Sequence, residues 1–90
     1  MELREETTCI ALIVEGVEVG EITWSVAGES LWIIDHTFVD ESQRGQGYAD
    51  KLVQASVERA RREGKKILPL CPFAKKVIEG TPEYQDVLNK

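Results

Sequence analysis

The hydrophobic pattern of the chain changes its period once, near residue 45, and this change limits the folds open to it. Before it, residues 7–14, 17–26 and 31–39 are rich in side chains that favour a pleated, half-buried surface, with turns at Glu15-Gly16 and at 27–30. After it, residues 48–63 repeat apolar side chains at helical spacing. We therefore expect three antiparallel strands followed by an amphipathic helix.

The remainder of the chain predicts a fourth strand and two short helices. Cations in the last turn and Gly64 after it indicate the end of the long helix, and residues 65–70 predict a short strand. Pro72 suits the first turn of a helix that ends near Ile78, and a final short helix follows Pro82. Because a helix joins the third and fourth strands, these two strands are expected to be parallel, in an α+β fold with helices packed on the sheet.

The segment 31–39 carries apolar residues at both alternating sets of positions. We expect this third strand to lie inside the sheet and to be covered on both sides. In that arrangement His36 shares a face with Trp32, Ile34 and Phe38, and groups at the end of the strand are shielded from bulk water.

Size and composition indicate one globular domain over residues 1–90, with 42% hydrophobic and 30% charged residues. The longest apolar runs, 9–14 and 31–34, are far below the ~18 residues that a membrane span needs, and the first residues do not resemble a signal peptide. We expect a cytoplasmic protein without a membrane partner.

The net charge of -5 is distributed unevenly. Residues 1–42 hold ten acids and one base, whereas residues 43–66 hold seven bases and three acids. An acidic body with one basic segment argues against nucleic-acid binding, which needs a broad cationic face. The basic segment suits a small anionic ligand, and the acidic segment would attract a cationic one.

Two cysteines and one histidine restrict metal and redox chemistry. Cys9 and Cys71 lack the CxxC spacing of a redox or zinc site, and a single histidine, His36, argues against a zinc cluster. We expect no metal and two reduced thiols. Cys9, in the middle of a strand, is assigned to the core.

The segment from Arg44 to Ala49 lies between the third strand and the long helix, where backbone N–H groups and the helix dipole converge on an anion. Its two glycines let the backbone approach phosphate oxygens, and Arg44 adds charge. A dinucleotide fingerprint would need a third glycine at Asp50, and the Gly-Lys-Ser/Thr of a P-loop is absent. The alternative is a flexible loop with a helix-starting glycine.

Arg44, Gly47 and Ala49 match the pattern Gln/Arg-x-x-Gly-x-Gly/Ala, and the loop thereby resembles that of the GNAT superfamily of acetyl-CoA-dependent N-acetyltransferases. Segments 34–39, 70–73 and 82–84 extend the likeness, over about residues 9–88, to the compact GNAT-like group. That group often has Glu where Phe38 stands and His where Thr81 stands, so the roles of those side chains are absent here.

The resemblance implies a three-stranded antiparallel meander, a fourth strand parallel to the third, and acetyl-CoA as cosubstrate. The pantetheine arm would add like an extra strand in a splay between the third and fourth strands, and amides near Val39 would stabilise the oxyanion. The residues that this implies for CoA are the pyrophosphate loop Arg44, Gly45, Gln46, Gly47, Tyr48 and Ala49, together with Phe38, Val39, Cys71 and Phe73.

The same resemblance makes Cys71 the suspected catalytic residue, as nucleophile or as proton donor to the departing CoA thiolate. Because Cys71 directly precedes Pro72, the dipole of the following helix should lower the pKa of its thiol. The alternative is a buried cysteine packed as a small hydrophobe. His36 can deprotonate an incoming ammonium, directly or through water, or it is a hydrogen-bonded structural histidine. Tyr84 is assigned to packing of the terminal helix, and the alternative is that its hydroxyl faces the thioester.

Two functional hypotheses follow. The first is an acetyl-CoA-binding N-acetyltransferase that transfers an acetyl group to an amine, not identified by the sequence, of a peptide or small molecule. The second is a non-catalytic acyl-CoA-binding or regulatory module, since a compact domain lacks the later strands that shape an acceptor pocket. A general interaction domain without ligand is a third reading.

Overall fold

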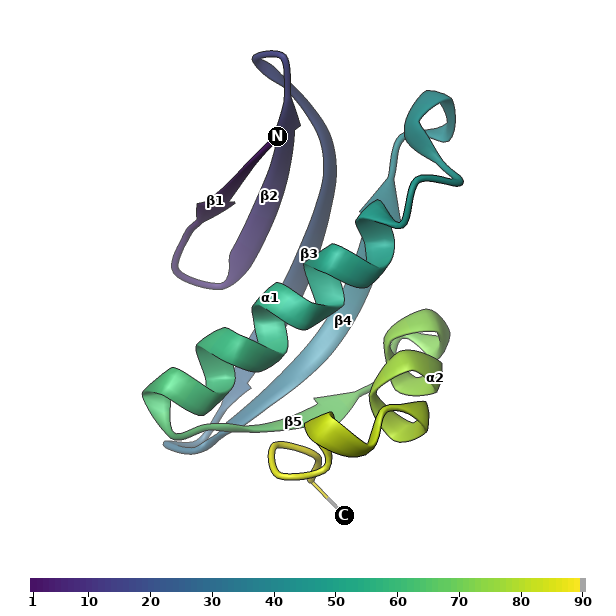
Figure 1. Ribbon diagram of the computed structural model, residues 1–90. Coiled ribbons are helices and arrows are strands. Elements are labelled where there is room, and N and C mark those ends of the chain that lie inside the picture. The colour runs from purple at the N-terminus through teal and green to yellow at the C-terminus, as the bar shows by residue number, and fades with distance from the viewer. Residues whose placement is uncertain (90) are drawn as a thin grey trace.

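The computed structural model describes residues 1–89 and contains a five-stranded sheet whose order follows the chain (Figure 1). Neighbouring strands pair antiparallel from the first to the fourth, and the fifth is parallel to the fourth. The strands are β1 (Glu2–Glu5), β2 (Cys9–Val14), β3 (Val17–Ala27), β4 (Leu31–Val39) and β5 (Lys66–Pro69). The meander and the parallel pair are confirmed, but the sheet has one more strand at its N-terminal edge than the sequence predicts.

The long helix α1 (Tyr48–Glu63) begins and ends at the predicted residues. Gly47 and Gly64 flank it with φ of 76° and 71°, in the left-handed region that glycine adopts most easily. The second helix, α2 (Pro72–Gly80), ends two residues later than expected, and the final helix is a single 3₁₀ turn, η2 (Pro82–Tyr84). A further 3₁₀ turn, η1 (Glu41–Gln43), follows β4.

The additional strand β1 is exposed at all four positions. It therefore lacks the alternation of buried and exposed residues from which a strand could be predicted. It forms because its backbone pairs with β2 and because its last residue, Glu5, is held by α1. A Glu5 carboxylate oxygen lies 2.7 Å from Arg62 and 3.6 Å from Arg59. Tertiary contacts, rather than a local pattern, therefore determine this strand.

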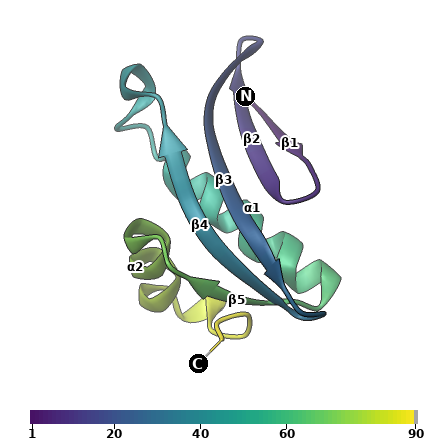
Figure 2. The same cartoon turned by 180° about the vertical axis from the view of Figure 1, so that it is seen from behind.

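The core lies between the sheet and the two helices, which pack on the same face of the sheet and contact each other. From behind, β2, β3 and β4 stand in front of α1, and no helix covers this side of them (Figure 2). The helices α1 and α2 contribute Leu52, Val53, Val57, Ala60, Ala74 and Ile78, and the sheet contributes Ile10, Leu12, Ile22 and Ile34, all at most 1% exposed. The expected packing of helices on the sheet is confirmed.

A bulge in β4 changes which face its later residues occupy. Trp24 of β3 pairs with Ile34, but the preceding Thr23 pairs with His36, so Asp35 is the extra residue. Ile34 is 1% exposed and faces the helices, whereas Asp35 and His36 are both exposed. The alternation of faces is therefore reset in the middle of the strand.

Two expectations about the third predicted strand, β4, are wrong because of this bulge and of the uncovered side of the sheet. His36 does not share a face with Trp32 and Ile34. It lies on the side away from the helices, where its ring stacks on that of Phe38 with centroids 6.1 Å apart. Phe38 is 43% exposed, so the end of β4 is not shielded from water on both sides.

Within residues 1–89, neither helix has the length and apolar composition that crossing a membrane requires. Nor do those residues bring together three or more His, Cys, Asp or Glu side chains that could hold a metal ion.

Candidate active site

The loop between β4 and α1 presents a run of backbone amides without acceptors. Asp40 begins the loop by accepting the Ser42 amide at 2.9 Å, which folds the chain into η1. The first hydrogen bond of α1 is donated by the Lys51 amide to the Gly47 carbonyl (3.1 Å). Among the described residues, the six amides from 45 to 50 donate no hydrogen bond. A helix start ordinarily leaves four such donors, so the loop adds two.

Two glycines shape this loop, and both have left-handed backbones. Gly45 has φ of 85° and Gly47 has φ of 76°. A Cβ at either position would meet no protein atom within 4 Å, so the space beside the loop is open. An L side chain would still strain the backbone there, so both positions favour glycine.

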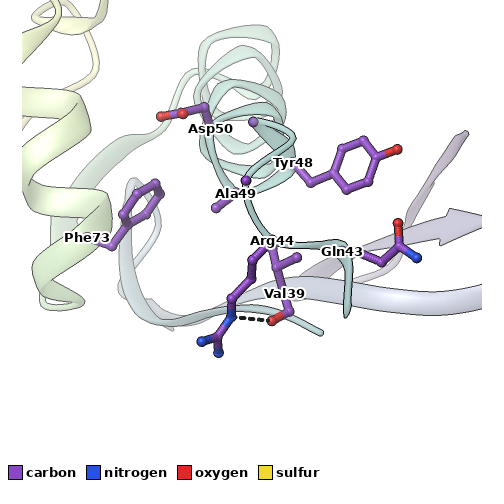
Figure 3. A pocket seen from close by; sticks show the side chains of 9 residues that line it. Val39, Gln43, Arg44, Tyr48, Ala49, Asp50 and Phe73 are labelled. Atoms are coloured by element: carbon purple, nitrogen blue, oxygen red, sulfur yellow. Dashed lines mark hydrogen bonds between the residues drawn. The ribbon is translucent and has the colours of Figure 1, made fainter. Parts of the chain in front are cut away.

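The open space is a pocket of about 230 Å³ at the N-terminus of α1 (Figure 3). Phe73 at the start of α2 bounds it on one side, and the first turn of α1 forms another wall. The lining residues are Val39, Gln43, Arg44, Gly45, Gly47, Tyr48, Ala49, Asp50 and Phe73. Seven of them are residues that the sequence assigned to the cofactor; Gln43 and Asp50 are additional.

Two opposite charges stand at this pocket. The Arg44 guanidinium donates from Nε to the Val39 carbonyl at 3.1 Å, and this bond holds the exposed side chain at the loop (Figure 3). The Asp50 carboxylate lies in the first turn of α1, where it complements the helix dipole. An anion in the pocket would therefore be attracted by Arg44 and by the amides and repelled by Asp50.

The strands β4 and β5 separate close to the pocket. Their pairing runs from Leu31 with Lys66 to Ile34 with Pro69, where proline offers no N–H to continue it. The amides of Leu70 and Cys71 both donate to the Ile34 carbonyl, at 3.0 and 3.3 Å, and the chain then turns into α2. After Ile34, β4 continues to Val39, and no strand within residues 1–89 pairs with it on this side.

Cys71 lies where the two strands separate. It is the N-cap residue of α2, is half-buried, and its thiol lies 3.7 Å from the Thr37 hydroxyl in the unpaired part of β4. Burial raises the pKa of the thiol, but the amides of Ala74 and Phe73 and the hydroxyl of Thr37 together outweigh it, so the pKa of Cys71 is below its ordinary value. The sequence expectation of a helix start that favours the thiolate agrees with this arrangement.

Comparison with known proteins shows to which family this chain belongs. The model of the GCN5-related N-acetyltransferases matches residues 9–87. The solution structure of a GCN5-like protein from Staphylococcus aureus is 35% identical, with a TM-score of 0.79 over 98% of this chain and 87% of that one. The chain belongs to the GCN5-related N-acetyltransferase family.

More distant structures share the fold alone. An aminoglycoside 6'-N-acetyltransferase in complex with coenzyme A is 21% identical (TM-score 0.62), and 68% of this chain covers 35% of it. The Mycobacterium tuberculosis protein Rv2747, in complex with CoA, is also 21% identical (TM-score 0.66), and 88% of this chain covers 56% of it. A search of curated protein sequences finds no match. This GCN5-related domain therefore corresponds to about half or less of these two longer proteins.

Besides Cys71, three residues that the sequence assigned to the site lie outside the pocket lining. The side chains of Phe38 and His36 are on the uncovered face of the sheet, and no side-chain hydrogen bond holds His36 among residues 1–89. Gln46 contacts Gln43 instead, with its amide 3.4 Å from the Gln43 Oε1. His36 and Thr37 are consecutive in a pleated strand, so their side chains point to opposite faces. This GCN5-related domain thus separates its one histidine from Cys71 by the thickness of the sheet.

Cys9 differs from Cys71 in its surroundings. It is the first residue of β2 rather than its middle, and it is half-buried, so its assignment to the core is only partly right. Burial raises the pKa of its thiol, and the carboxylates of Glu6, Glu21 and Glu18 raise it further. Of the two thiols, that of Cys71 is therefore the more readily deprotonated.

Gln43, Asp50 and Thr37 were missed by sequence reasoning. Gln43 and Asp50 flank the glycine motif directly, so a wider reading of the loop would have included them. Thr37 could be found only through the junction of β4 and β5, because it is 34 positions from Cys71.

Proposed function

We propose that this chain is an acetyl-CoA-dependent N-acetyltransferase that acetylates an amine. The observation that carries the proposal is the run of six free amides at the N-terminus of α1, which opens into a pocket beside the unpaired edge of β4. Family membership supports the reaction class, and the CoA-bound relatives with the same fold support the cosubstrate.

In this proposal the amides of residues 45–50 bind the CoA pyrophosphate, and Arg44 adds its charge. The pantetheine arm lies along the unpaired edge of β4 toward Cys71 and uses main-chain hydrogen bonds as an added strand does. Phe73 and Val39 supply apolar contact. The amide near the end of β4 would face the carbonyl oxygen that becomes negative in the transition state.

The reaction then needs two protons to leave the ammonium nitrogen, one before attack and one as the amide forms, and one proton to reach the CoA sulfur. The free amine attacks the thioester carbonyl carbon after its ammonium proton passes to His36, directly or through water, and the C–S bond breaks as the tetrahedral intermediate collapses. The Cys71 thiol gives its proton to the departing thiolate, and the second proton of the amine, released as the amide forms, restores the thiol directly or through water. The separation of His36 and Cys71 by the sheet supports this assignment, because acceptor and cosubstrate then approach from opposite faces.

The alternative role of Cys71 is covalent. Its thiolate would attack the thioester carbon, CoA thiolate would leave with a proton from solvent, and the amine would then take the acetyl group from Cys71. The lowered pKa of Cys71 supports this route equally well. Mass analysis after incubation with acetyl-CoA separates the two, since only the covalent route leaves an acetyl group on the Cys71 peptide.

The test combines calorimetry with turnover. CoA should bind to the wild-type protein, and acetyl-CoA should be consumed with at least one amine of a panel. Cys71→Ser should lower turnover about 100-fold while CoA affinity stays within about twofold, because the pyrophosphate contacts lie elsewhere. Cys9→Ser is the matched control and should retain turnover. CoA binding without turnover on any amine would favour the non-catalytic acyl-CoA-binding module instead.

A further inference from the structure

The face of the sheet that no helix covers carries a second set of chemical groups (Figure 2). The strand register places Phe38 directly opposite Glu21, Glu21 opposite Ala11, and Glu18 opposite Ile13. Because paired residues project to the same side, these side chains share the face of His36. We call this surface the outer face, and it comprises Glu2, Glu18, Glu21, Asp35, His36 and Phe38.

The outer face is strongly negative. It holds four carboxylates, and the base paired to this side in β1, Arg4, lies 3.9 Å from one of them, on Glu2. Two of the others, Glu21 and Glu18, act on Cys9: the pKa of its thiol is raised first by burial and by Glu6, and then by these two carboxylates. Carboxylates on this side of the sheet, distributed over the strands from β1 to β4, therefore attract an approaching cation.

An aromatic pair stands beside the carboxylates. The rings of His36 and Phe38 stack at 6.1 Å with 12° between their planes, and Phe38 keeps 43% of its surface exposed. Glu21 lies directly opposite Phe38 in the strand register, and the Ser25 hydroxyl donates to the carboxylate of Asp35, the residue before His36, at 2.8 Å. A carboxylate beside an exposed aromatic ring is a combination that attracts an ammonium or guanidinium group.

We propose that the outer face docks a lysine-rich peptide segment and that such a segment is the acetyl acceptor, a specificity that rests on the proposed function. The face is open, with Glu18, Asp35 and His36 exposed, and it extends roughly 14 Å across the four strands of the meander, at about 4.8 Å per strand. Such an extended surface suits a peptide that spreads several positive charges over it. Phe38 also lies in the part of β4 that continues past β5, so a lysine held there is next to the gap between the strands.

The experiment measures binding of fluorescein-labelled tetralysine by anisotropy, in the absence of acetyl-CoA, at about 20 and about 200 mM salt. Binding should be clearly weaker at the higher salt concentration, because salt screens the attraction between charges. The test variant is Glu21→Gln with Asp35→Asn. The matched control is Glu58→Gln with Glu79→Gln, which removes the same charge from exposed positions on α1 and α2. We expect the outer-face variant to bind about three- to tenfold more weakly and the control to stay within about 1.5-fold.

Several results would overturn the proposal. Absence of tetralysine binding at low salt would do so, as would equal weakening in the two double variants, which would indicate only attraction to the net charge. Tighter binding of spermine than of tetralysine would replace the peptide with a small polyamine. CoA affinity, measured in the same samples, distinguishes failure of the proposed function from failure of the proposed acceptor. If the wild-type protein binds no CoA, the proposed function is wrong. If it binds CoA but no peptide, only the proposed acceptor class is wrong.

Discussion

The two ends of α1 are built alike and used differently. Each is flanked by a glycine in the left-handed conformation, Gly47 at the start and Gly64 at the end. At the C-terminal end, the Gly64 amide donates hydrogen bonds to carbonyls of the last turn, and the arginines of that turn form ion pairs within the chain. At the start, six amides remain free. The difference separates the groups that hold the fold from the groups that remain available for a ligand.

At the C-terminal end the charges are paired within the chain. Arg59 lies over the stacked rings of Trp24 and Trp32, at 5.2 and 5.7 Å, and contacts Glu5 and Glu63. The Arg61 guanidinium hydrogen bonds to Asp86 and holds the pKa of that carboxyl below its ordinary value. Lys65 and Lys66 donate to backbone carbonyls. Most basic side chains of the segment that the sequence assigned to an anionic ligand therefore make contacts within the chain that stabilise the fold.

The largest effect should come from the occupied end. Arg59 is 12% exposed in its side chain, and Arg59→Ala removes two ion pairs and uncovers the tryptophan pair, so we predict a loss of about 2–4 kcal/mol in the free energy of unfolding. Urea denaturation measures it. Arg62→Ala, at a side chain 60% exposed, is the control and should cost less than about 1 kcal/mol. If the two variants lost equal free energy of unfolding, Arg59 would contribute no more to stability than an exposed arginine.

At the free end, Gly47→Val should weaken CoA binding by at least about tenfold. The side chain would enter the open space in front of the amides, and the left-handed backbone would relax away from its present φ. Gly28→Val is the matched control, since Gly28 has φ of 78° and equally open surroundings in the turn after β3. Calorimetry should show normal CoA affinity in the control; a folded Gly47→Val protein with normal affinity would move the site elsewhere.

A smaller effect is expected at Arg44. Its guanidinium is exposed and already donates to the Val39 carbonyl, so Arg44→Ala should weaken CoA binding about three- to fivefold at low salt and less at high salt. Lys51→Ala provides the comparison, because Lys51 lines a different depression beside Met1 and Leu3. If the Lys51 variant lost as much affinity as the Arg44 variant, the contact of Arg44 with the ligand would be only general attraction.

The smallest effect has the opposite sign. Asp50→Asn removes a negative charge from the wall of the pocket, so CoA should bind about twofold more tightly, an advantage that salt reduces. Titration calorimetry at two salt concentrations measures it. Weaker binding would indicate instead that the carboxylate contacts the ligand directly.

Local patterns in the sequence were sufficient for α1 and for the glycine loop that precedes it. The apolar stripe of 48–63 and the two glycines beside it specify the helix without help from the rest of the chain. The loop is a local structure as well, because free amides follow from any helix start that glycines leave open. Five of the nine pocket-lining residues belong to this loop and were named from it, whereas Val39 and Phe73 were named only through the family resemblance.

What the sequence could not show depends on distant partners. The strand β1 owes its place to Arg59 and Arg62, more than fifty positions later. The face of His36 depends on a bulge at Asp35, which shifts the register by one residue and leaves no composition signal. The contact of Thr37 with Cys71 exists only after β4 and β5 have paired.

The connectivity of the sheet also orders its assembly. Strands β1 to β4 are joined by short turns, so their contacts are close in sequence, whereas Leu31 meets Lys66 only after the whole of α1 has been placed. Closing that long loop is the step that creates the gap between β4 and β5 and sets Cys71 beside Thr37. Amide hydrogen exchange in β5 should therefore be faster than in β2 and β3, and CoA should slow it, because a ligand seated across the late-forming junction holds closed the part of the molecule that opens first.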